Sequence, residues 1–132
     1  MNAEWDQTLQ SRIGTVLVVE DEVLTRMMIA ETLREAGLVV VEAGNADEAM
    51  AYIKGGAAVD LVFADIEMPG AMNGAVLARR LRAEFPGIKV MLTSGGSRTP
   101  ETTSIAPFVS KPYDLGAVVA QISRALTEPP PK

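Results

Sequence analysis

The chain has 132 residues, of which 48% are hydrophobic, and this length and composition suit one domain with a buried core better than two domains. It contains no cysteine and no histidine, which excludes disulfides, thiolate or imidazole metal ligands, and serine–histidine catalysis. Its net charge of −5 argues against direct binding to nucleic acid, which requires a surplus of lysine and arginine.

The two ends of the chain are expected to lie outside the folded domain. Residues 1–12 are mostly polar and predict a flexible leader, and residues 128–132 include three consecutive prolines and predict a disordered tail. The leader lacks the basic start and apolar stretch of a secretion signal, and no apolar run reaches the roughly 18 residues of a membrane span. We therefore expect a cytoplasmic protein with one domain at residues 13–127, without an effector domain or a membrane contact.

Short apolar runs alternate along the chain with longer segments of helical period. The strand-like runs fall at residues 16–19, 39–41, 61–64, 90–92 and 108–109. The helix-like segments fall at residues 24–36, 46–53, 77–85, 95–106 and 115–126. In the first helical segment the apolar stripe runs through Met28, Ile29 and Leu33. The fourth segment is rich in poor helix formers, so we expect that helix to be short or irregular.

This alternation predicts an α/β fold, a doubly wound parallel sheet of five strands flanked by five helices. Several strand-like runs are apolar at successive positions, which is typical of strands covered by helices on both faces. Right-handed crossovers place the carboxyl ends of all parallel strands at one edge of such a sheet, where ligands bind.

Polar side chains follow the apolar runs at the points where the strands are expected to end. Glu20 and Asp21 follow the first strand, Asp65 the third, Thr93 the fourth and Lys111 the fifth. Carboxylates that converge in one space either hold a proton or bind a cation, and an all-oxygen set favours Mg²⁺ or Mn²⁺. The sequence therefore predicts a divalent-cation site with an amine beside it.

Each of these residues also has an ordinary structural interpretation. Acidic residues before a helix commonly cap its first turn, and an isolated aspartate before a proline-containing loop commonly forms an Asx-turn. Thr93 fits a strand-end residue, and Lys111 fits a solvated surface charge. Their order favours a shared site, because acid, acid, hydroxyl and amine appear at successive strand ends of one sheet.

Five short blocks resemble, in order and spacing, the receiver domain of two-component response regulators. They are Val-Val-Glu-Asp-Glu at residues 18–22, Asp-Ile-Glu-Met-Pro-Gly at 65–70, Asn-Gly at 73–74, Leu-Thr-Ser-Gly at 92–95 and Lys-Pro at 111–112. The resemblance extends over about residues 15–126. It implies the flavodoxin-like, or CheY-like, arrangement of a five-stranded parallel sheet and five helices.

The resemblance also implies roles for individual residues around a phosphoacceptor. Asp65 is similar to the aspartate that takes the phosphoryl group. Glu20 and Asp21 are similar to the acidic pair that binds Mg²⁺ or Mn²⁺, together with Asp65 and the backbone carbonyl of Glu67. These assignments imply an aspartyl phosphate formed with the help of a divalent ion.

A second group of residues resembles the elements that respond to phosphorylation. Thr93 is similar to the switch hydroxyl, Lys111 to the phosphate-pairing amine and Phe108 to the switch aromatic. Pro112 is a candidate for the proline that follows a cis peptide bond.

By resemblance, the chain is expected to act in bacterial signal transduction as a phosphorelay component. It would take a phosphoryl group from a histidine kinase or histidine phosphotransfer protein and signal to a downstream protein, without direct DNA binding. Such a domain assists its own phosphorylation and dephosphorylation but is not an enzyme. The alternative is a scaffold of the same fold that works without phosphorylation. A cofactor-binding relative of flavodoxin is disfavoured, because Glu20, Asp21 and Glu22 would repel a phosphate.

Overall fold

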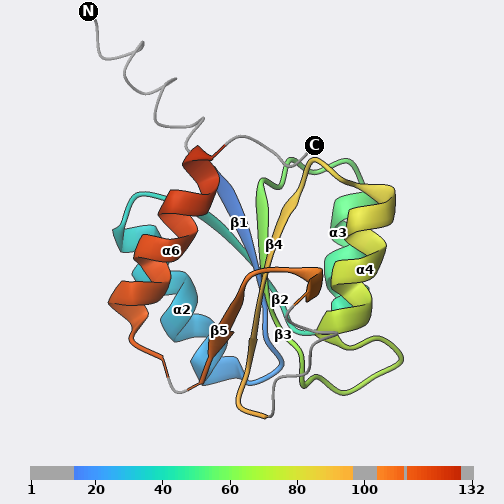
Figure 1. The fold of residues 1–132 in the computed structure, drawn as a ribbon, viewed down its shortest axis with the longest axis horizontal. Helices are drawn as coiled ribbons and strands as arrows, with labels where there is room; N and C mark the ends of the chain where they lie inside the picture. Colours follow the sequence, from blue (N-terminus) through green and yellow to red (C-terminus); the bar gives the residue numbers. More distant parts are fainter. Residues whose placement is uncertain (1–13, 97–103, 112, 129–132) are drawn as a thin grey trace, which may run out of the picture.

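The structure, a computed structural model, describes residues 14–96, 104–111 and 113–128, and within them five strands form one parallel sheet. The strands are β1 (Thr15–Val19), β2 (Val39–Ala43), β3 (Leu61–Asp65), β4 (Lys89–Ser94) and β5 (Phe108–Ser110). The helices are α2 (Val23–Glu35), α3 (Ala46–Lys54), α4 (Gly74–Glu84) and α6 (Leu115–Thr127). The strand order is β2-β1-β3-β4-β5, and Figure 1 shows α2 and α6 on one face of the sheet and α3 and α4 on the other.

This arrangement confirms the predicted doubly wound, five-stranded parallel sheet. The described residues contain four complete helices rather than the five expected. Most of the predicted fourth helix lies at residues 97–103, outside the described residues, although Ser104 and Ile105 at its end are helical. The expected leader at residues 1–12 and residues 129–132 of the expected tail also lie outside the description. In the part of the chain that is described, no helix has both the length and the apolar character needed to span a membrane.

The apolar strands are buried because both faces of the sheet are covered. In β1, Leu17 and Val19 pack in the hydrophobic cluster that includes α3 and α4, whereas Val16 and Val18 pack in the cluster that includes α2 and α6. Successive side chains of a strand point to opposite faces, so a strand between two helical layers must be apolar at every position. This explains the uninterrupted apolar runs of the sequence.

The buried stripe of α2 is narrower than the sequence indicated. Ile29, Ala30 and Leu33 are buried, but Met28 is 58% exposed and Leu24 is 68% exposed. Met28 precedes Ile29 by one position, which rotates its side chain by about 100° around the helix axis and away from the sheet. Of the three residues named for the apolar stripe, Ile29 and Leu33 are therefore the ones that pack in the core, whereas Met28 and the other exposed apolar residues of α2 face outward.

The start of α4 is fixed directly against the end of β3. Asn73 caps the helix, since its side-chain oxygen accepts a hydrogen bond from the Val76 amide at 2.9 Å. A Cβ atom at Gly74 would lie 2.3 Å from the carbonyl oxygen of Asp65, so only glycine permits this approach. The loop of residues 66–73 is thereby held close to Asp65.

Candidate functional site

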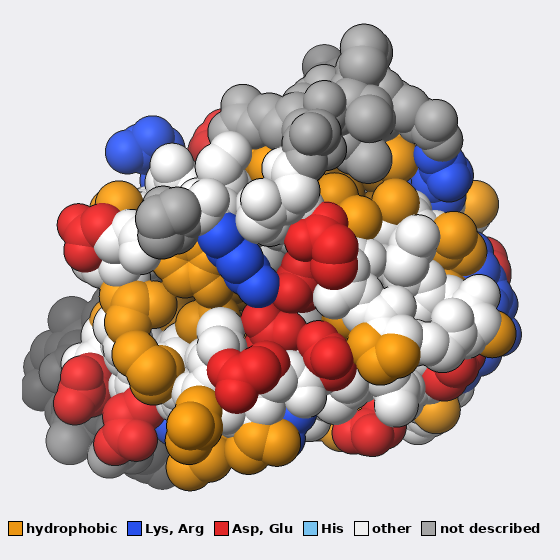
Figure 2. All heavy atoms as spheres, turned by 90° about the horizontal axis from the view of Figure 1, so that it is seen from below, with side chains coloured by type: hydrophobic (Ala, Val, Ile, Leu, Met, Phe, Trp, Pro, Cys, Tyr) orange, Lys and Arg blue, Asp and Glu red, His pale blue; other side chains and the backbone are white. Residues whose placement is uncertain are grey.

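Three carboxylates meet at the edge of the sheet where the strands end. One carboxylate oxygen from each of Glu20, Asp21 and Asp65 lies within 4.8 Å of the other two. Glu20 and Asp65 are buried, with 2% and 4% of their surface exposed, whereas Asp21 is exposed. Figure 2 looks onto this edge and shows acidic side chains gathered at its centre. The structure thus brings together the two acidic side chains that follow β1 and the aspartate that ends β3.

Lys111 provides the positive charge of the cluster. Its Nζ atom lies 2.7 Å from Oδ2 of Asp65 and 3.1 Å from Oε1 of Glu20. Burial raises the pKa of Glu20 above its ordinary value, and the charge of Asp65 adds to this effect. Burial by itself would lower the pKa of Lys111, but its hydrogen bonds with Asp65 and Glu20 prevail and raise it. Lys111 therefore stays protonated and is not simply a solvated charge.

The raised pKa of Glu20 predicts how the stability of the metal-free protein depends on pH. The folded protein holds the Glu20 proton more tightly than the unfolded chain, where the ordinary pKa is 4.5. The contribution of Glu20 to the free energy of unfolding is therefore fully present below pH 4.5 and is lost as pH rises through the folded-state pKa. In urea unfolding with a chelator, the wild type should lose stability relative to Glu20→Gln over that interval. Parallel pH profiles for the two proteins would contradict the raised pKa.

Of the two ordinary structural roles expected for the acidic residues, the helix cap belongs to a neighbouring glutamate and the Asx-turn is formed by Asp65. Glu22, not Glu20 or Asp21, caps α2, because its Oε1 accepts a hydrogen bond from the Thr25 amide at 2.9 Å. Asp65 does form an Asx-turn, since its Oδ1 accepts from the Glu67 amide at 3.0 Å. Its other oxygen contacts Lys111. The turn therefore orients the Asp65 carboxylate toward the cluster and does not compete with a role in chemistry.

Thr93 lies beside Asp65 in the sheet, in the paired position on β4. Its side chain is buried, with 2% of the residue exposed, and its hydroxyl has no hydrogen-bond partner among the described atoms. A buried hydroxyl without a partner costs about 1–3 kcal/mol. Thr93 is thus able to gain stabilisation from any acceptor that arrives next to Asp65.

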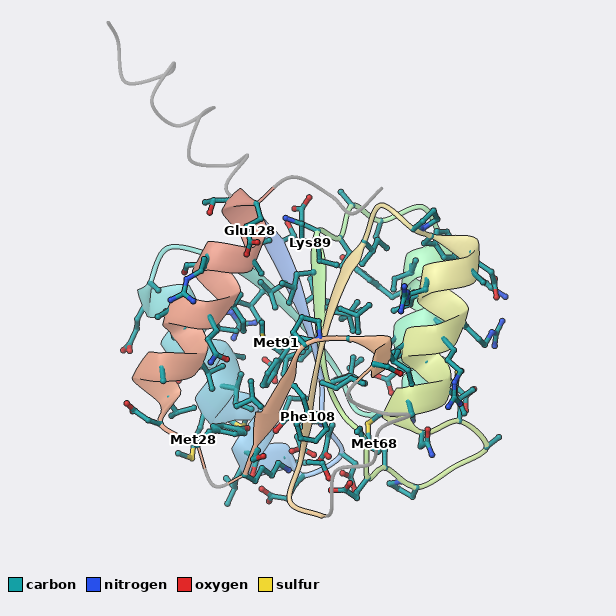
Figure 3. The ribbon with its side chains drawn as sticks, in the orientation of Figure 1. Met28, Met68, Lys89, Met91, Phe108 and Glu128 are labelled. Atoms are coloured by element: carbon teal, nitrogen blue, oxygen red, sulfur yellow. The ribbon has the colours of Figure 1, made fainter. Side chains whose placement is uncertain are left out.

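Phe108 begins β5, where it pairs with Leu92 of β4. Its ring is partly buried and packs against the hydrophobic cluster on the α3 and α4 side of the sheet (Figure 3). It therefore lies one strand position before Val109, the residue opposite Thr93. Pro112, the candidate for a cis peptide bond, lies outside the described residues.

The side chain of Glu67 has contacts that sequence reasoning missed. Its Oε1 accepts a hydrogen bond from the Gly95 amide at 3.1 Å, and its Oε2 accepts one from the Ser94 hydroxyl. The carboxylate therefore joins the loop after β3 to the loop after β4. No spacing in the sequence signals this contact, because the partners are 27 and 28 residues away.

The chemistry of the cluster suits a hard divalent cation. The three carboxylates of Glu20, Asp21 and Asp65 offer only oxygen ligands, and their mutual repulsion is relieved when a cation binds. Mg²⁺ commonly binds through a few carboxylates and retains water or phosphate oxygens in its other positions. The exposed side of the cluster at Asp21 leaves room for such ligands.

An apolar hollow of about 540 Å³ lies next to the acidic cluster. Its lining includes Lys111 from the site, Met28 and Ile29 from α2, and Tyr113 and Leu115 at the start of α6. The rest of the exposed apolar surface of α2 consists of Val23, Leu24 and Met27. An incoming group that reaches Asp65 thus meets an apolar surface beside a charged one (Figure 2).

Comparison with known proteins finds one family model and several curated proteins that match most of the chain. The family model for the response regulator receiver domain matches residues 16–123. The chain is 33% identical over 119 residues to the sensor kinase CckA of Brucella abortus, covering 86% of the chain and 12% of that protein. It is 32% identical over 119 residues to the phosphate regulon transcriptional regulatory protein PhoB of Pseudomonas aeruginosa, covering 85% and 51%. The chain thus spans about half or less of the length of these curated relatives.

Solved structures agree with the sequence comparison. The receiver domain from the hybrid histidine kinase CckA superposes with a TM-score of 0.74 at 30% identity, covering 86% of this chain and 100% of that one. The response regulator protein TrrA from Thermotoga maritima, solved in complex with Mg²⁺ and BeF, has a TM-score of 0.77 at 29% identity. This second match covers 86% of this chain and 98% of that one.

Proposed function

Because the chain belongs to the response regulator receiver domain family, we propose that it takes a phosphoryl group onto Asp65 from a phosphohistidine of a histidine kinase or histidine phosphotransfer protein. It is a signalling domain of two-component systems rather than a classical enzyme. The observation that carries the proposal is the convergence of Glu20, Asp21 and Asp65 within 4.8 Å of one another, with the Lys111 ammonium on two of them.

The transfer needs a positioned nucleophile and positive charge rather than an elaborate active site. The Asp65 carboxylate attacks phosphorus as the bond to the donor imidazole nitrogen breaks, and the imidazole, which carries a proton on its other ring nitrogen, leaves in neutral form. The Glu67 amide and Lys111 hold one carboxylate oxygen each, so the nucleophile has a fixed orientation. Lys111 also places its charge where the phosphoryl oxygens arrive.

Glu20, Asp21, Asp65 and the backbone carbonyl of Glu67 are the residues that would hold Mg²⁺ or Mn²⁺. When bound, the ion would supply positive charge that offsets the charge of the phosphoryl oxygens. The carboxylate donor set supports this assignment, since it has oxygen ligands only and two of its members are buried together. The similar TrrA structure was solved with Mg²⁺, which favours the same ion here.

Phosphorylation would then be converted into a change of shape through Thr93 and Phe108. The buried Thr93 hydroxyl has no partner in the described structure and would donate to the new phosphoryl oxygens. Movement of Thr93 would free space toward β5, into which the partly buried ring of Phe108 would rotate. The surface around β5 would thereby have two states for a downstream protein to distinguish.

A small-molecule phosphodonor tests this function without knowledge of the cognate kinase. Incubation of the protein with an acyl phosphate and Mg²⁺, followed by intact mass measurement, should show the addition of one phosphoryl group. A chelator should abolish the addition. Failure to gain mass under these conditions would support the alternative, a scaffold that acts without phosphorylation.

The donor protein is proposed to contact the exposed apolar side chains of α2. A phosphohistidine can reach Asp65 only through the open side of the cluster, so its carrier must cover the adjacent surface. Leu24 is 68% exposed in the first turn of α2, and Met28 shares the hollow with Lys111. Clusters of exposed apolar residues commonly mark surfaces that bind other proteins.

Leu24→Gln is expected to slow phosphotransfer from a histidine-phosphorylated carrier by about tenfold or more, because burial of a leucine contributes roughly 1.5–3 kcal/mol. Phosphorylation by an acyl phosphate should keep its wild-type rate, since the site itself is unchanged. Tyr52→Gln on α3, a partly exposed position on the other face of the sheet, serves as the control. Equal rates for both variants with the carrier would exclude α2 as the docking surface.

A further inference from the structure

We propose that Arg26 of α2 is a positioning residue for the divalent-cation site, acting through the main chain of Glu20. This inference rests on the proposed function, because it assumes that the acidic cluster binds a cation. The Nη1 atom of Arg26 donates a hydrogen bond to the carbonyl oxygen of Glu20 at 2.9 Å. Its Nε atom lies 3.3 Å from Oε1 of Glu42 on β2, and its side chain is only 19% exposed.

The bonded carbonyl belongs to the peptide unit that joins Glu20 to Asp21. Because the peptide unit is planar, fixing the direction of its C=O bond restricts ψ of Glu20 and φ of Asp21 together. These two residues supply two of the three carboxylates in the cluster. A single hydrogen bond from Arg26 therefore constrains the directions in which both acids leave the main chain.

This constraint acts on a residue that lies just beyond the regular backbone pairing of the sheet. The pairing of β1 with β2 ends at Val19 and Ala43, and Glu20 comes directly after it. The Glu20 amide still donates to the Ala43 carbonyl at 3.1 Å. Arg26 donates a hydrogen bond to the carbonyl of the same residue and a second one to the Glu42 carboxylate on β2. Glu20 is thus fixed through both its amide and its carbonyl.

Arg34 gives a matched comparison within the same helix. It also pairs with Glu42, with Nη1 at 3.3 Å from Oε2, and it donates to the Val40 carbonyl at 3.0 Å. Loss of either arginine removes one positive charge and one contact with Glu42. Only loss of Arg26 releases the carbonyl of Glu20.

Removal of Arg26 is expected to change the cation affinity in opposite directions, depending on whether Arg26 acts through its charge or through the orientation of the ligands. Loss of a positive charge near the acidic cluster should by itself strengthen the binding of a cation. Loss of a group that orients metal ligands should weaken binding, typically by about 10- to 100-fold. The sign of the change therefore distinguishes the two explanations.

The test is a titration of the unphosphorylated protein with Mn²⁺, with free Mn²⁺ followed by electron paramagnetic resonance. We expect Arg26→Ala to raise the dissociation constant by about tenfold or more, and Arg34→Ala to leave it within about twofold of the wild type. Equal or tighter binding by Arg26→Ala than by Arg34→Ala would overturn the inference. Absence of Mn²⁺ binding by the wild type would instead refute the proposed cation site, and the inference with it.

Glu42→Ala separates the contact with Glu20 from the pair with Glu42. This variant removes the carboxylate that both arginines share but leaves the bond from Arg26 to the Glu20 carbonyl. We expect its Mn²⁺ affinity to stay near the wild-type value. Weakening equal to that of Arg26→Ala would show that Glu42, not the Glu20 carbonyl, is responsible. Should Arg26→Ala fail to unfold cooperatively in urea, Arg26→Met provides the same comparison with a smaller loss of packing, because methionine has no N–H donor for the Glu20 carbonyl.

Discussion

Asp65→Asn is expected to abolish phosphorylation by both an acyl phosphate and a histidine-phosphorylated carrier. Asparagine has nearly the same shape as aspartate, but its amide is not a competent nucleophile for phosphoryl transfer. The substitution also removes one of the two negative charges that Lys111 contacts and one of the three carboxylates of the acidic cluster. Intact mass measurement should therefore find no added phosphoryl group, even after long incubation with Mg²⁺.

Asp60→Asn is the matched control for this variant. Asp60 precedes β3, whose last residue is Asp65, so the two aspartates lie at opposite ends of the same strand. The side chain of Asp60 accepts a hydrogen bond from the Thr15 amide at 2.8 Å and takes no part in the acidic cluster. We expect Asp60→Asn to gain a phosphoryl group as the wild type does. A mass gain by Asp65→Asn that equals the wild-type gain would place the phosphoacceptor elsewhere.

The sheet and the meeting of the acids could be predicted because they follow from chain-wide patterns. Runs such as residues 16–19 are apolar at every position, and this pattern leaves few alternatives to a strand covered on both faces. Once the strands are parallel, the topology brings their carboxyl ends to one edge. Glu20, Asp65 and Lys111 meet there although Glu20 and Lys111 are 91 residues apart in sequence.

The features that the sequence did not reveal are hydrogen bonds and packing contacts made by individual side chains with elements distant in the sequence. The Glu67 carboxylate bonds to the loop after β4, and Arg26 bonds to the end of β1. Nothing in their local sequence distinguishes these residues from solvated charges. The exposure of Met28 was missed for a similar reason, because the width of the buried stripe on α2 depends on how the helix packs against the sheet. Periodicity identifies a buried face but does not fix its width.

Lys111→Met is expected to destabilise the metal-free protein and to slow its phosphorylation. The substitution leaves Glu20 and Asp65 close together, buried, and without the ammonium that now contacts both. Breaking a fully buried charge pair costs about 3–5 kcal/mol, and we expect about 1–3 kcal/mol here because the Lys111 side chain is 29% exposed. Loss of one group that stabilises the transferring phosphoryl oxygens should slow phosphorylation by about 100-fold or more.

The response to Mg²⁺ and pH separates this effect from a simple loss of packing. Urea unfolding in a chelator should show a deficit for Lys111→Met that grows as pH rises from below 4.5 through the raised folded-state pKa of Glu20, because protonation of Glu20 relieves the repulsion. Mg²⁺ should restore much of the lost stability, since a cation in the cluster replaces the missing ammonium. Lys54→Met, which removes only an exposed contact with Glu84 at 3.9 Å, should change stability by less than about 1 kcal/mol. If Mg²⁺ stabilised Lys111→Met no more than the wild type, repulsion between the buried acids would not be the cause of its deficit, and Lys111 would contribute through its packing alone.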